Sequence, residues 1–354
     1  MMIKAKNLSL VALLAMVVVC ATSFWVASYL HRPLAITQDE IIEVPAGGSL
    51  NGLINNMAQR GMLGDAESDI LLHRLSVRGY NIFTNVSHRL HVGEYKLHPG
   101  DTLVDVMQKL ERGDVLQRSF ALIEGWNTRE LRRALQRTEG LVIRLAGVSD
   151  EQMMVELGKP GRHPEGWFAP DTYFYTSGES DVDILKRAML RQESILDTLW
   201  RDRDTGLPYS DPYDALIMAS IVEKETGAAH ERPQIAGVFV QRLLRGMRLQ
   251  TDPTVIYGMG DAYQGNIRRK DLQEPTPYNT YVIRGMPPTP IAMPGERAIY
   301  AAMHPAETQS LYFVARGDGT HKFSTTLQEH QQAVREYQLK RKQNYRSAPA
   351  VETR

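Results

Sequence analysis

The chain of 354 residues has little of what several classes of protein need. Its single cysteine, Cys20, allows no disulfide within the chain, so the folded part must be stable through packing alone. Lys plus Arg and Asp plus Glu number 41 each, which leaves no net charge to attract nucleic acid. The ten histidines form no metal-binding motif, and no G-x-x-x-x-G-K-[ST] or G-x-S-x-G sequence occurs. We therefore expect no metal and no cofactor.

Charged side chains are missing from residues 8–30, a stretch long enough to cross the ~30 Å hydrocarbon layer of a membrane as a helix. Lys4 and Lys6 precede it and favour a cytoplasmic location for residues 1–7. We predict an uncleaved transmembrane helix over 8–30, with the rest of the chain exported. A cleaved signal peptide is the alternative, although the small-residue cleavage sites are poor.

Two segments after this stretch repeat one another at an offset of 53 residues. Residues 44–50 and 97–103 each contain a strand end, a glycine turn and a Ser or Thr that can cap a following amphipathic helix. Between them we expect a helix over about 70–78 and a strand over about 92–97. The pattern predicts a small α+β module over 40–117.

The rest of the chain is predicted to form one mixed α/β domain over 118–338, followed by a basic polar tail over 339–354. Seven of the 18 prolines fall between 275 and 305, which predicts stiff, non-helical loops there. The segment around residues 250–254 is also turn-rich. The predicted regular elements are a strand over 121–125, helices over 128–137, 181–202, 211–226 and 231–245, and a hairpin joining 311–315 to 321–324.

One carboxylate, Glu223, interrupts an apolar run in the predicted helix 211–226. Leu216, Ala219, Ser220 and Glu223 follow the spacing of a single helix face. An acid on such a face is either a paired core residue or a group kept dry enough to hold a proton near neutral pH. General acid catalysis needs the second kind of group. Glu225 lies roughly 200° further round the helix, so we expect it at the surface or in a salt bridge.

Residues 165–175 concentrate aromatic rings, a proline and two carboxylates. Aromatic planes with polar tips are the side chains on which sugar rings stack, so Trp167, Asp171 and Tyr173 are candidates for a sugar-binding subsite. The alternative is a core cluster at a strand edge, in which Asp171 and Tyr173 satisfy each other.

Several separated motifs resemble the endolytic murein transglycosylase family (MltG, YceG-like). They run in order from the predicted anchor to about residue 335. They are EGWFAPDTY at 165–173, ASIVEKET at 219–226, LQTDPTVIYG at 249–258, YNTY at 278–281, GMPPTPI at 285–291 with Pro294 and Gly295, and LYFV at 311–314 with His321, Phe323 and His330. Separately, residues 93–103 resemble the glycan-binding LysM fold.

The resemblance implies an α+β protein with a single transmembrane helix, a LysM-like module and a YceG-like catalytic domain. It implies an inner-membrane protein of a double-membraned bacterium, with its catalytic domain in the periplasm. The family cuts the MurNAc-GlcNAc β-1,4 bond within nascent glycan strands and is associated with terminating their elongation. Its implied partners are peptidoglycan strands and inner-membrane peptidoglycan synthases, with no cofactor.

The family's catalytic acid maps onto Glu223. The implied reaction protonates the glycosidic oxygen and leaves a 1,6-anhydro-MurNAc end, because the sugar's own C6 hydroxyl attacks C1. Such a reaction needs no second carboxylate to activate water. We expect Glu223→Gln to fold normally and to lose essentially all cleavage. Candidate substrate-positioning residues are Gln250, Thr251, Asp252, Tyr278, Asn279 and Tyr281.

Other interpretations stay open. Asp252 precedes a proline and is a common turn initiator, and His321 is typical of a hydrogen-bonding residue in a hairpin. The segment before His330 departs from the family pattern, which puts a role for His330 in doubt. Two other functions also fit: a membrane-anchored, non-catalytic peptidoglycan-binding scaffold, and a lysozyme-type muramidase that hydrolyses the bond. Glu225 and Glu165 are the next candidates for the acid.

Overall fold

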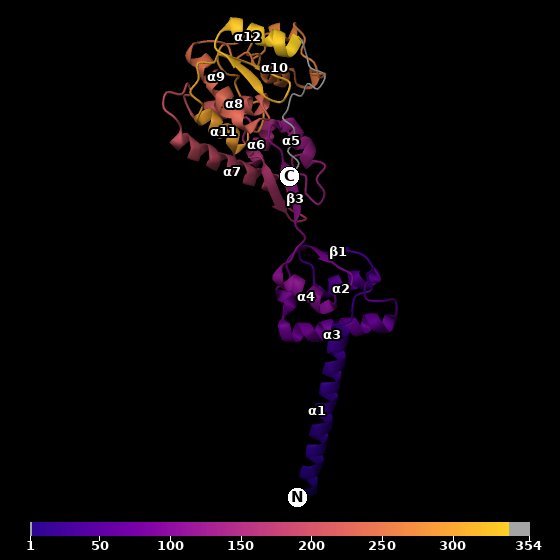
Figure 1. Ribbon diagram of the computed structural model, residues 1–354. Coiled ribbons are helices and arrows are strands. Elements are labelled where there is room, and N and C mark those ends of the chain that lie inside the picture. The colour runs from indigo at the N-terminus through magenta and orange to yellow at the C-terminus, as the bar shows by residue number, and fades with distance from the viewer. Residues whose placement is uncertain (1, 340–354) are drawn as a thin grey trace. The chain divides into compact units, whose positions relative to one another are not determined.

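The computed structural model describes residues 2–339, and Figure 1 shows its elements along the chain. The protein is a mixed α+β structure, in which the described strands form three two-stranded sheets. The chain divides into two compact units. One comprises residues 1–118 and 174–178, and the other comprises residues 119–173 and 179–354. The predicted tail over 339–354 lies outside the described residues, except for Leu339.

The first unit begins with helix α1 (Met2–Leu30), which includes the segment predicted to cross a membrane. Among the described residues, no helix combines the length and the apolar character that a membrane crossing requires.

After α1 the first unit has the order strand, two helices, strand and helix. Its elements are β1 (Glu40–Val44), α2 (Leu50–Gln59), α3 (Glu67–Thr84), η1 (Val86–His88), β2 (Gly93–Leu97) and α4 (Leu103–Arg112). The two strands are antiparallel, with Glu40 opposite Leu97. The Ser49 hydroxyl accepts from the Gly52 N–H at the start of α2, and Thr102 forms a capping box with Asp105 at the start of α4. The helix starts predicted from the repeat are therefore confirmed.

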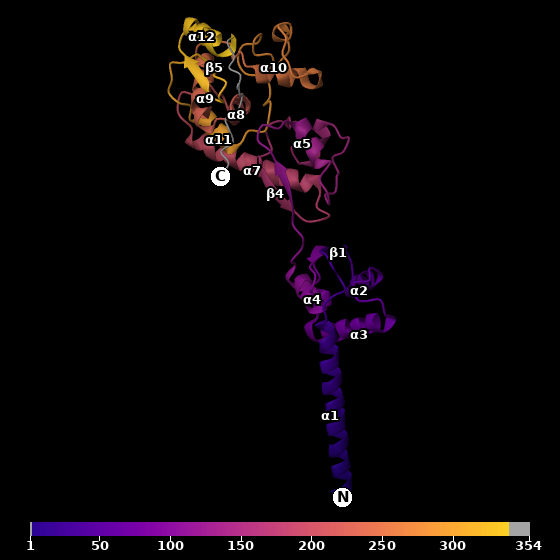
Figure 2. The ribbon, with the colours of Figure 1, turned by 45° about the vertical axis from the view of Figure 1, so that its right-hand side comes forward.

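The second unit contains most of the helices, as Figure 2 shows. Strand β3 pairs with β4, and β5 pairs with β6. Most of β3 and β4 belongs to this unit, whereas Arg118, Phe174 and Tyr175 at their ends are assigned to the first unit. The elements are β3 (Arg118–Leu122), α5 (Thr128–Leu135), α6 (Asp150–Glu156), β4 (Asp171–Tyr175), α7 (Asp181–Asp202), α8 (Pro212–Glu225), η2 (Ala229–Glu231), α9 (Arg232–Leu244), α10 (Asp252–Met259), η3 (Gly260–Ala262), η4 (Asp271–Gln273), α11 (Glu296–Met303), β5 (Tyr312–Ala315), β6 (His321–Ser324), α12 (Leu327–Val334) and the π-helical turn η5 (Arg335–Leu339).

Helix α8 is the centre of the second unit. It starts at Pro212 after the N-cap Asp211, whose carboxylate accepts from the backbone N–H groups of Tyr213 and Asp214. Every residue from Ala215 to Val222 is buried, because the helix packs against α7, α9, α10 and α11. A helix that is apolar all round belongs in the middle of a fold. Apart from Asp214 in its first turn, α8 carries charged side chains only at its C-terminal end, and the site is built there.

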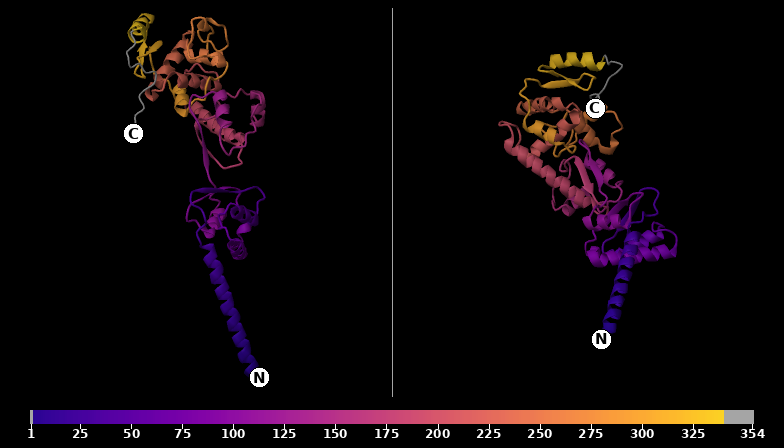
Figure 3. Two further views of the ribbon diagram at one scale, coloured as in Figure 1. Left: turned by 90° about the vertical axis from the view of Figure 1, so that its right-hand side faces the viewer. Right: turned by 60° about the horizontal axis from the view of Figure 1, so that its bottom comes forward.

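The hairpin predicted at 311–324 is confirmed. Strand β5 runs antiparallel to β6 with Phe313 opposite Phe323, and α12 packs on the pair. Figure 3 shows this hairpin and helix in yellow. His321 lies in this hairpin, where its N–H and Nδ1 both contact the buried carboxylate of Glu231, at 2.9 and 2.8 Å. The prediction that His321 is a hydrogen-bonding residue of the hairpin is therefore confirmed.

The turn predicted around residues 250–254 is wrong. Asp252 begins helix α10, and Pro253 occupies its first turn. Proline is tolerated there because its missing N–H has no helical partner in any case. Helices α6 and α11, each of eight residues or fewer, were also not predicted.

We expect Gly237→Ala to destabilise the second unit by about 1–3 kcal/mol, the usual cost of overpacking a core. A Cβ on Gly237 in α9 would lie 2.4 Å from the carbonyl oxygen of Ala306, which is held by its own N–H bond to Pro233. Thermal unfolding followed by circular dichroism measures the change.

The matched control is Gly52→Ala in α2, where the nearest atom is 3.4 Å from the new Cβ. This variant should be neutral or slightly stabilising, because alanine favours the helix. Equal stability of Gly237→Ala and the parent protein would contradict the packing described for α9.

Candidate active site

Two carboxylates end helix α8, and they face different surroundings. Glu223 and Glu225 are separated by two residues, which is roughly 200° around a helix. Both lie in the last turn, where the helix dipole disfavours negative charge. What surrounds each carboxylate therefore decides its chemistry.

Glu223 is tied into an ion-pair network. Its Oε1 accepts from Nη2 of Arg232 at 2.9 Å, and its Oε2 accepts from the backbone N–H of Gly295 at 3.0 Å. The Glu223 side chain is only 5% exposed and that of Arg232 is 9% exposed. Burial raises the pKa of Glu223, while Arg232 and the Gly295 N–H oppose that shift. Both carboxylate oxygens are thus occupied by donors that favour the charged form.

Among the described residues, Glu225 forms no ion pair like that between Glu223 and Arg232. Its hydrogen bond within the described structure is donated by the hydroxyl of Thr251, a neutral group. Burial, together with repulsion from the neighbouring Asp252 carboxylate, raises the pKa of Glu225 to about 7 against the opposing effects of the Thr251 hydroxyl and Arg242. The side chain therefore holds a proton close to neutral pH, which is the property required of a general acid. The expectation that Glu225 lies at the surface or in a salt bridge is wrong.

Glu225 lines a cavity of about 580 Å³. This size is within the range of small-molecule sites. The cavity is formed by the end of α8, the segment before α10, the hairpin and α12. Four of the residues predicted to position substrate are found here with Glu225, and five other polar residues join them. The predicted residues are Gln250, Thr251, Asp252 and Tyr281, and the others are Arg242, Tyr312, His321, His330 and Gln338.

The segment before α10 is held rigidly. Gln250 adopts a left-handed backbone with φ of 52°, which is uncommon for a residue other than glycine. Its N–H bonds to the Thr280 carbonyl at 3.2 Å, and the Thr251 N–H bonds to the Thr280 hydroxyl at 3.1 Å. The Tyr281 hydroxyl donates to Oδ1 of Asp252 at 2.6 Å. These bonds fix Thr251 and Asp252 beside Glu225.

Arg242, on α9, lines the cavity and connects two of the segments that form it. It is 7% exposed, and it donates to the backbone carbonyls of Leu311, at 2.6 Å, and Leu249, at 2.7 Å. Burial lowers its pKa. It ties the hairpin to the segment before α10, and its charge partly offsets the desolvation of Glu225.

His330, on α12, stacks on Tyr312 with ring centroids 5.2 Å apart. Burial and the nearby charge of Arg242 lower the pKa of His330, which favours the neutral imidazole. Its Nδ1 has no hydrogen-bond partner among residues 2–339. It is therefore placed to contact a ligand in the cavity with a neutral ring.

The other predicted substrate residues serve the fold. Asn279 is fully buried, and its amide nitrogen bonds to the carbonyls of Asp271 and Glu274 at 3.2 and 2.7 Å. The Tyr278 hydroxyl bonds to the Thr289 hydroxyl at 2.9 Å. Both residues shape the loop that presents Tyr281, and neither lines the Glu225 cavity.

The aromatic motif at 165–175 is mostly core. Trp167 is 8% exposed and stacks on Tyr213, and Tyr173 is 7% exposed and donates to the Ala169 carbonyl at 2.6 Å. Buried rings of this kind offer no face to a sugar. Asp171 pairs with Arg191 at 3.0 Å, so the idea that Asp171 and Tyr173 satisfy each other is wrong.

Glu165, the third candidate acid, is a buried residue that joins two helices through hydrogen bonds. It is 2% exposed, accepts from the Thr128 N–H at 3.1 Å and accepts from the Tyr257 hydroxyl at 2.9 Å. Burial raises its pKa to about 7. The residue joins the start of α5 to α10, and it lines neither the Glu225 cavity nor the other large cavities found in this unit.

Sequence reasoning missed Arg242 and Tyr312. Arg242 did carry a signal, because it is a charged residue between the apolar positions Val240 and Leu243 of a helix. The same signal drew attention to Glu223. Tyr312 lies in an apolar strand and has no comparable mark in the sequence.

We expect the Glu225 carboxyl to titrate near pH 7, and Thr251→Val to raise that pKa. The hydroxyl of Thr251 favours the charged carboxylate, so its removal makes ionisation harder. Carbon-13 NMR of the labelled glutamate side chains measures the pKa. Tyr281→Phe in the same cavity is a useful comparison, because its hydroxyl contacts Asp252 and not Glu225. A Glu225 pKa near that of free glutamate would contradict the site described here.

Comparison with known proteins agrees with the motifs. The YceG-like family model matches residues 42–336. The chain is 29% identical over 315 residues to a Bacillus subtilis protein named endolytic murein transglycosylase, with 84% of each chain covered. It is 23% identical over 334 residues to a Streptococcus pneumoniae protein of the same name, and it spans 58% of that protein's length. It also aligns with the crystal structure of a YceG-like protein from Listeria monocytogenes, with a TM-score of 0.53 and 26% identity over 84% of this chain and 99% of that one. The chain therefore belongs to the YceG-like family.

Proposed function

We propose that this protein is an endolytic lytic transglycosylase that cuts the MurNAc-GlcNAc β-1,4 bond within peptidoglycan strands. The observation that carries the proposal is the Glu225 cavity. Glu225, whose pKa is raised to about 7, lines this cavity together with polar and aromatic side chains. The names of the bacterial relatives and the family match point to the same activity.

The reaction uses Glu225 twice. The protonated carboxyl donates its proton to the glycosidic oxygen, the bond from that oxygen to MurNAc C1 breaks, and positive charge develops at C1. The resulting carboxylate then removes the proton from the C6 hydroxyl of the same sugar while O6 bonds to C1. The product is a 1,6-anhydro ring, no water is consumed, and Glu225 ends protonated again.

Asp252 has a supporting role in this mechanism. Its carboxylate accepts a hydrogen bond from Tyr281 and raises the pKa of Glu225. This favours the protonated form of Glu225, which the reaction needs. A fixed negative charge beside the cavity also stabilises the positive charge that develops at C1. Gln250 and His330 line the same cavity and can hydrogen-bond the sugar.

The presence of Asp252 also gives specific support to a second candidate, a lysozyme-type muramidase. Two carboxylates at one cavity are the equipment of a retaining glycosidase. The two reactions leave different chain ends, because a hydrolase adds a water that the transglycosylase does not. Mass analysis of uncrosslinked glycan strands after digestion separates them. Anhydro ends support the transglycosylase, and reducing ends overturn it.

We place the acid at Glu225, whereas the family motif by itself suggested Glu223. Glu225→Gln should therefore lower the rate of strand cleavage by ~10²–10⁴-fold, the usual contribution of a general acid. Glu223→Gln keeps the Glu225 cavity and should retain far more activity. Release of soluble fragments from purified strands measures both rates.

Because Glu223 is ion-paired to buried Arg232, Glu223→Gln can also weaken the fold, so both variants are compared by thermal unfolding. Loss of activity in folded Glu223→Gln, with activity kept in Glu225→Gln, would return the acid to position 223. Full activity in both variants would move the acid to another residue, and absence of cleavage by the wild-type protein would favour the non-catalytic scaffold.

We further propose that residues 8–30 anchor the chain in the inner membrane of a double-membraned bacterium, with the catalytic unit in the periplasm. Support comes from the lack of charged side chains in this stretch and from Lys4 and Lys6 before it. An anchor would hold the enzyme beside the peptidoglycan synthases of that membrane. The first unit, with its strand, two helices and strand, is proposed as a LysM-like module that contacts glycan.

In such a host, the full-length chain should remain with the inner-membrane fraction after an alkaline wash. Added protease should digest it only once the outer membrane is opened. A chain starting at residue 31 and given a cleavable export signal should instead be released with the periplasmic contents. Release of the full-length chain by the alkaline wash would contradict the anchor.

A further inference from the structure

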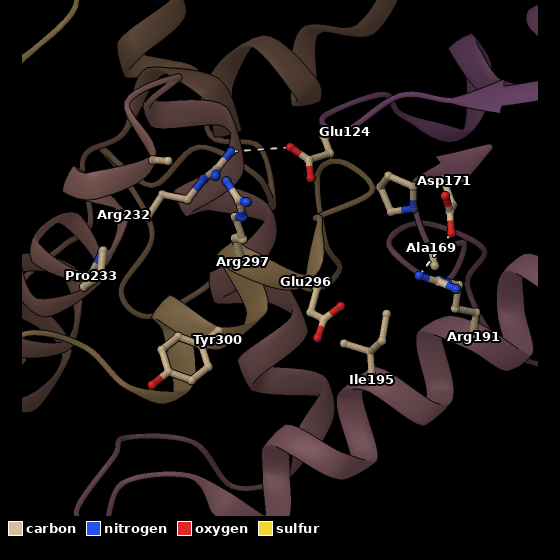
Figure 4. Close-up of a pocket in the computed structure, with 12 residues that line it drawn as sticks. Glu124, Ala169, Asp171, Arg191, Ile195, Arg232, Pro233, Glu296, Arg297 and Tyr300 are labelled. Carbon is tan, nitrogen blue, oxygen red and sulfur yellow. Dashed lines mark hydrogen bonds and ion pairs between the residues drawn. The ribbon is translucent and has the colours of Figure 1, made fainter.

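A second large cavity in the catalytic unit is lined by Arg232, the ion-pair partner of Glu223, and not by Glu225. Its volume is about 570 Å³, and its walls come from α7, α9, α11 and the residues around 124 and 170. Figure 4 shows the charged side chains that line it among apolar ones. Three arginines and three acids line it, namely Arg191, Arg232, Arg297, Glu124, Asp171 and Glu296.

Some of these charges are already paired. Arg191 contacts Asp171 at 3.0 Å, and Nη2 of Arg232 contacts Glu223 at 2.9 Å and Glu124 at 3.5 Å. Figure 4 marks the contact between Arg232 and Glu124 with a dashed line.

One hydrogen-bond donor of an arginine in this cavity has no acceptor among the described residues. Nε of Arg232 has no hydrogen-bond partner among the described residues, although the side chain is only 9% exposed. A buried guanidinium N–H without an acceptor is costly, so it marks a position where a ligand can supply one.

Arg297 adds an uncompensated positive charge. Within the described part of the chain it makes no ion pair, and it lies in the first turn of α11, where the helix dipole repels a cation. Arg297 and Arg232 thus both favour an anion in the cavity. Carboxylates suit guanidinium groups best, because two parallel hydrogen bonds can form. The acids Glu124 and Glu296 line the same cavity, and they favour a ligand that also carries a positive charge.

We propose that this cavity binds the peptide branch of peptidoglycan. The inference rests on the proposed function, since it names a second part of the same substrate. In strands that carry peptides the N-acetylated sugars are uncharged, because the lactyl carboxyl of MurNAc is bound to the peptide as an amide, so an ionic cavity offers them little. The peptide branches carry free carboxylates together with an amino group, which is the combination that this lining matches.

The position of the cavity suits this role. Arg232 bonds to Glu223, and Glu223 lies two residues before Glu225 on α8. The end of α8 therefore contributes Glu225 to the wall of the first cavity, and through Glu223 it binds Arg232 in the wall of the second cavity. Binding energy from a part of the substrate away from the reacting bond can raise the rate of reaction at that bond.

The test compares two substrates: uncrosslinked strands with their peptides, and the same strands after the peptides have been removed by an amidase. The second substrate keeps one carboxylate on each MurNAc lactyl group but lacks the carboxylates and the amino group of the peptide. Wild-type kcat/KM should be at least about tenfold higher for strands that carry peptides, a factor equivalent to about 1.4 kcal/mol. Arg297→Ala should remove most of this preference. Arg201→Ala is the matched control, because Arg201 is an exposed arginine on α7 that pairs with Asp197 outside the cavity.

A binding measurement keeps the test independent of catalysis. Free tetrapeptide released from peptidoglycan is titrated calorimetrically into the wild-type protein, Arg297→Ala and Arg201→Ala. Binding should weaken at least about tenfold in Arg297→Ala and when the peptide carboxylates are amidated, and it should be unchanged in Arg201→Ala.

The two proposals can fail separately. Peptide binding without cleavage of either substrate would reject the proposed function and keep the binding site. Cleavage without a peptide preference, with no peptide binding, would overturn the peptide site and leave the proposed function intact. Equal losses on both substrates in Arg297→Ala, again without peptide binding, would show that Arg297 serves only the fold.

Discussion

The catalytic unit depends on the burial of helix α8. Eight consecutive residues of this helix, from Ala215 to Val222, are enclosed by four other helices. That packing withdraws water from the end of the helix, where Glu223 and Glu225 lie. Removing water from a carboxylate disfavours its charge, and burial is the largest cause of the raised pKa at both positions.

The two acids meet this cost in different ways. Glu223 is paired with Arg232 and the Gly295 N–H, so it joins α8 to α9 and to the segment before α11. Glu225 is left with a neutral hydroxyl donor and a cavity, so it is stabilised by keeping its proton. Different environments separate the roles of two chemically identical residues. One serves as a structural ion pair, and the other is suited to proton transfer.

Much of the fold could be read from local patterns. The starts of α2 and α4 could be predicted from Ser49 and Thr102, because a capping hydroxyl and the apolar spacing that follows it are short-range properties. The glycine turn between β5 and β6 is likewise local. Helix α10 was hidden because Asp-Pro is found both in turns and at helix starts, and only the surrounding structure selects between them. Trp167 and Tyr173 were misjudged for a related reason, since aromatic rings that bind sugar and aromatic rings of a core have the same composition.

The sequence by itself determined the family, and it predicted a candidate acid within residues 219–226 and four of the polar residues that line the Glu225 cavity. Gln250, Thr251, Asp252 and Tyr281 were all identified without the structure, because their motifs are distinctive. Only the tertiary structure decided which glutamate those residues surround. Helical periodicity gives the angle between Glu223 and Glu225, but it does not say which side of α8 faces an arginine and which side faces a cavity. That difference is set by α9, α10 and the hairpin, whose contacts with α8 connect residues far apart in the chain.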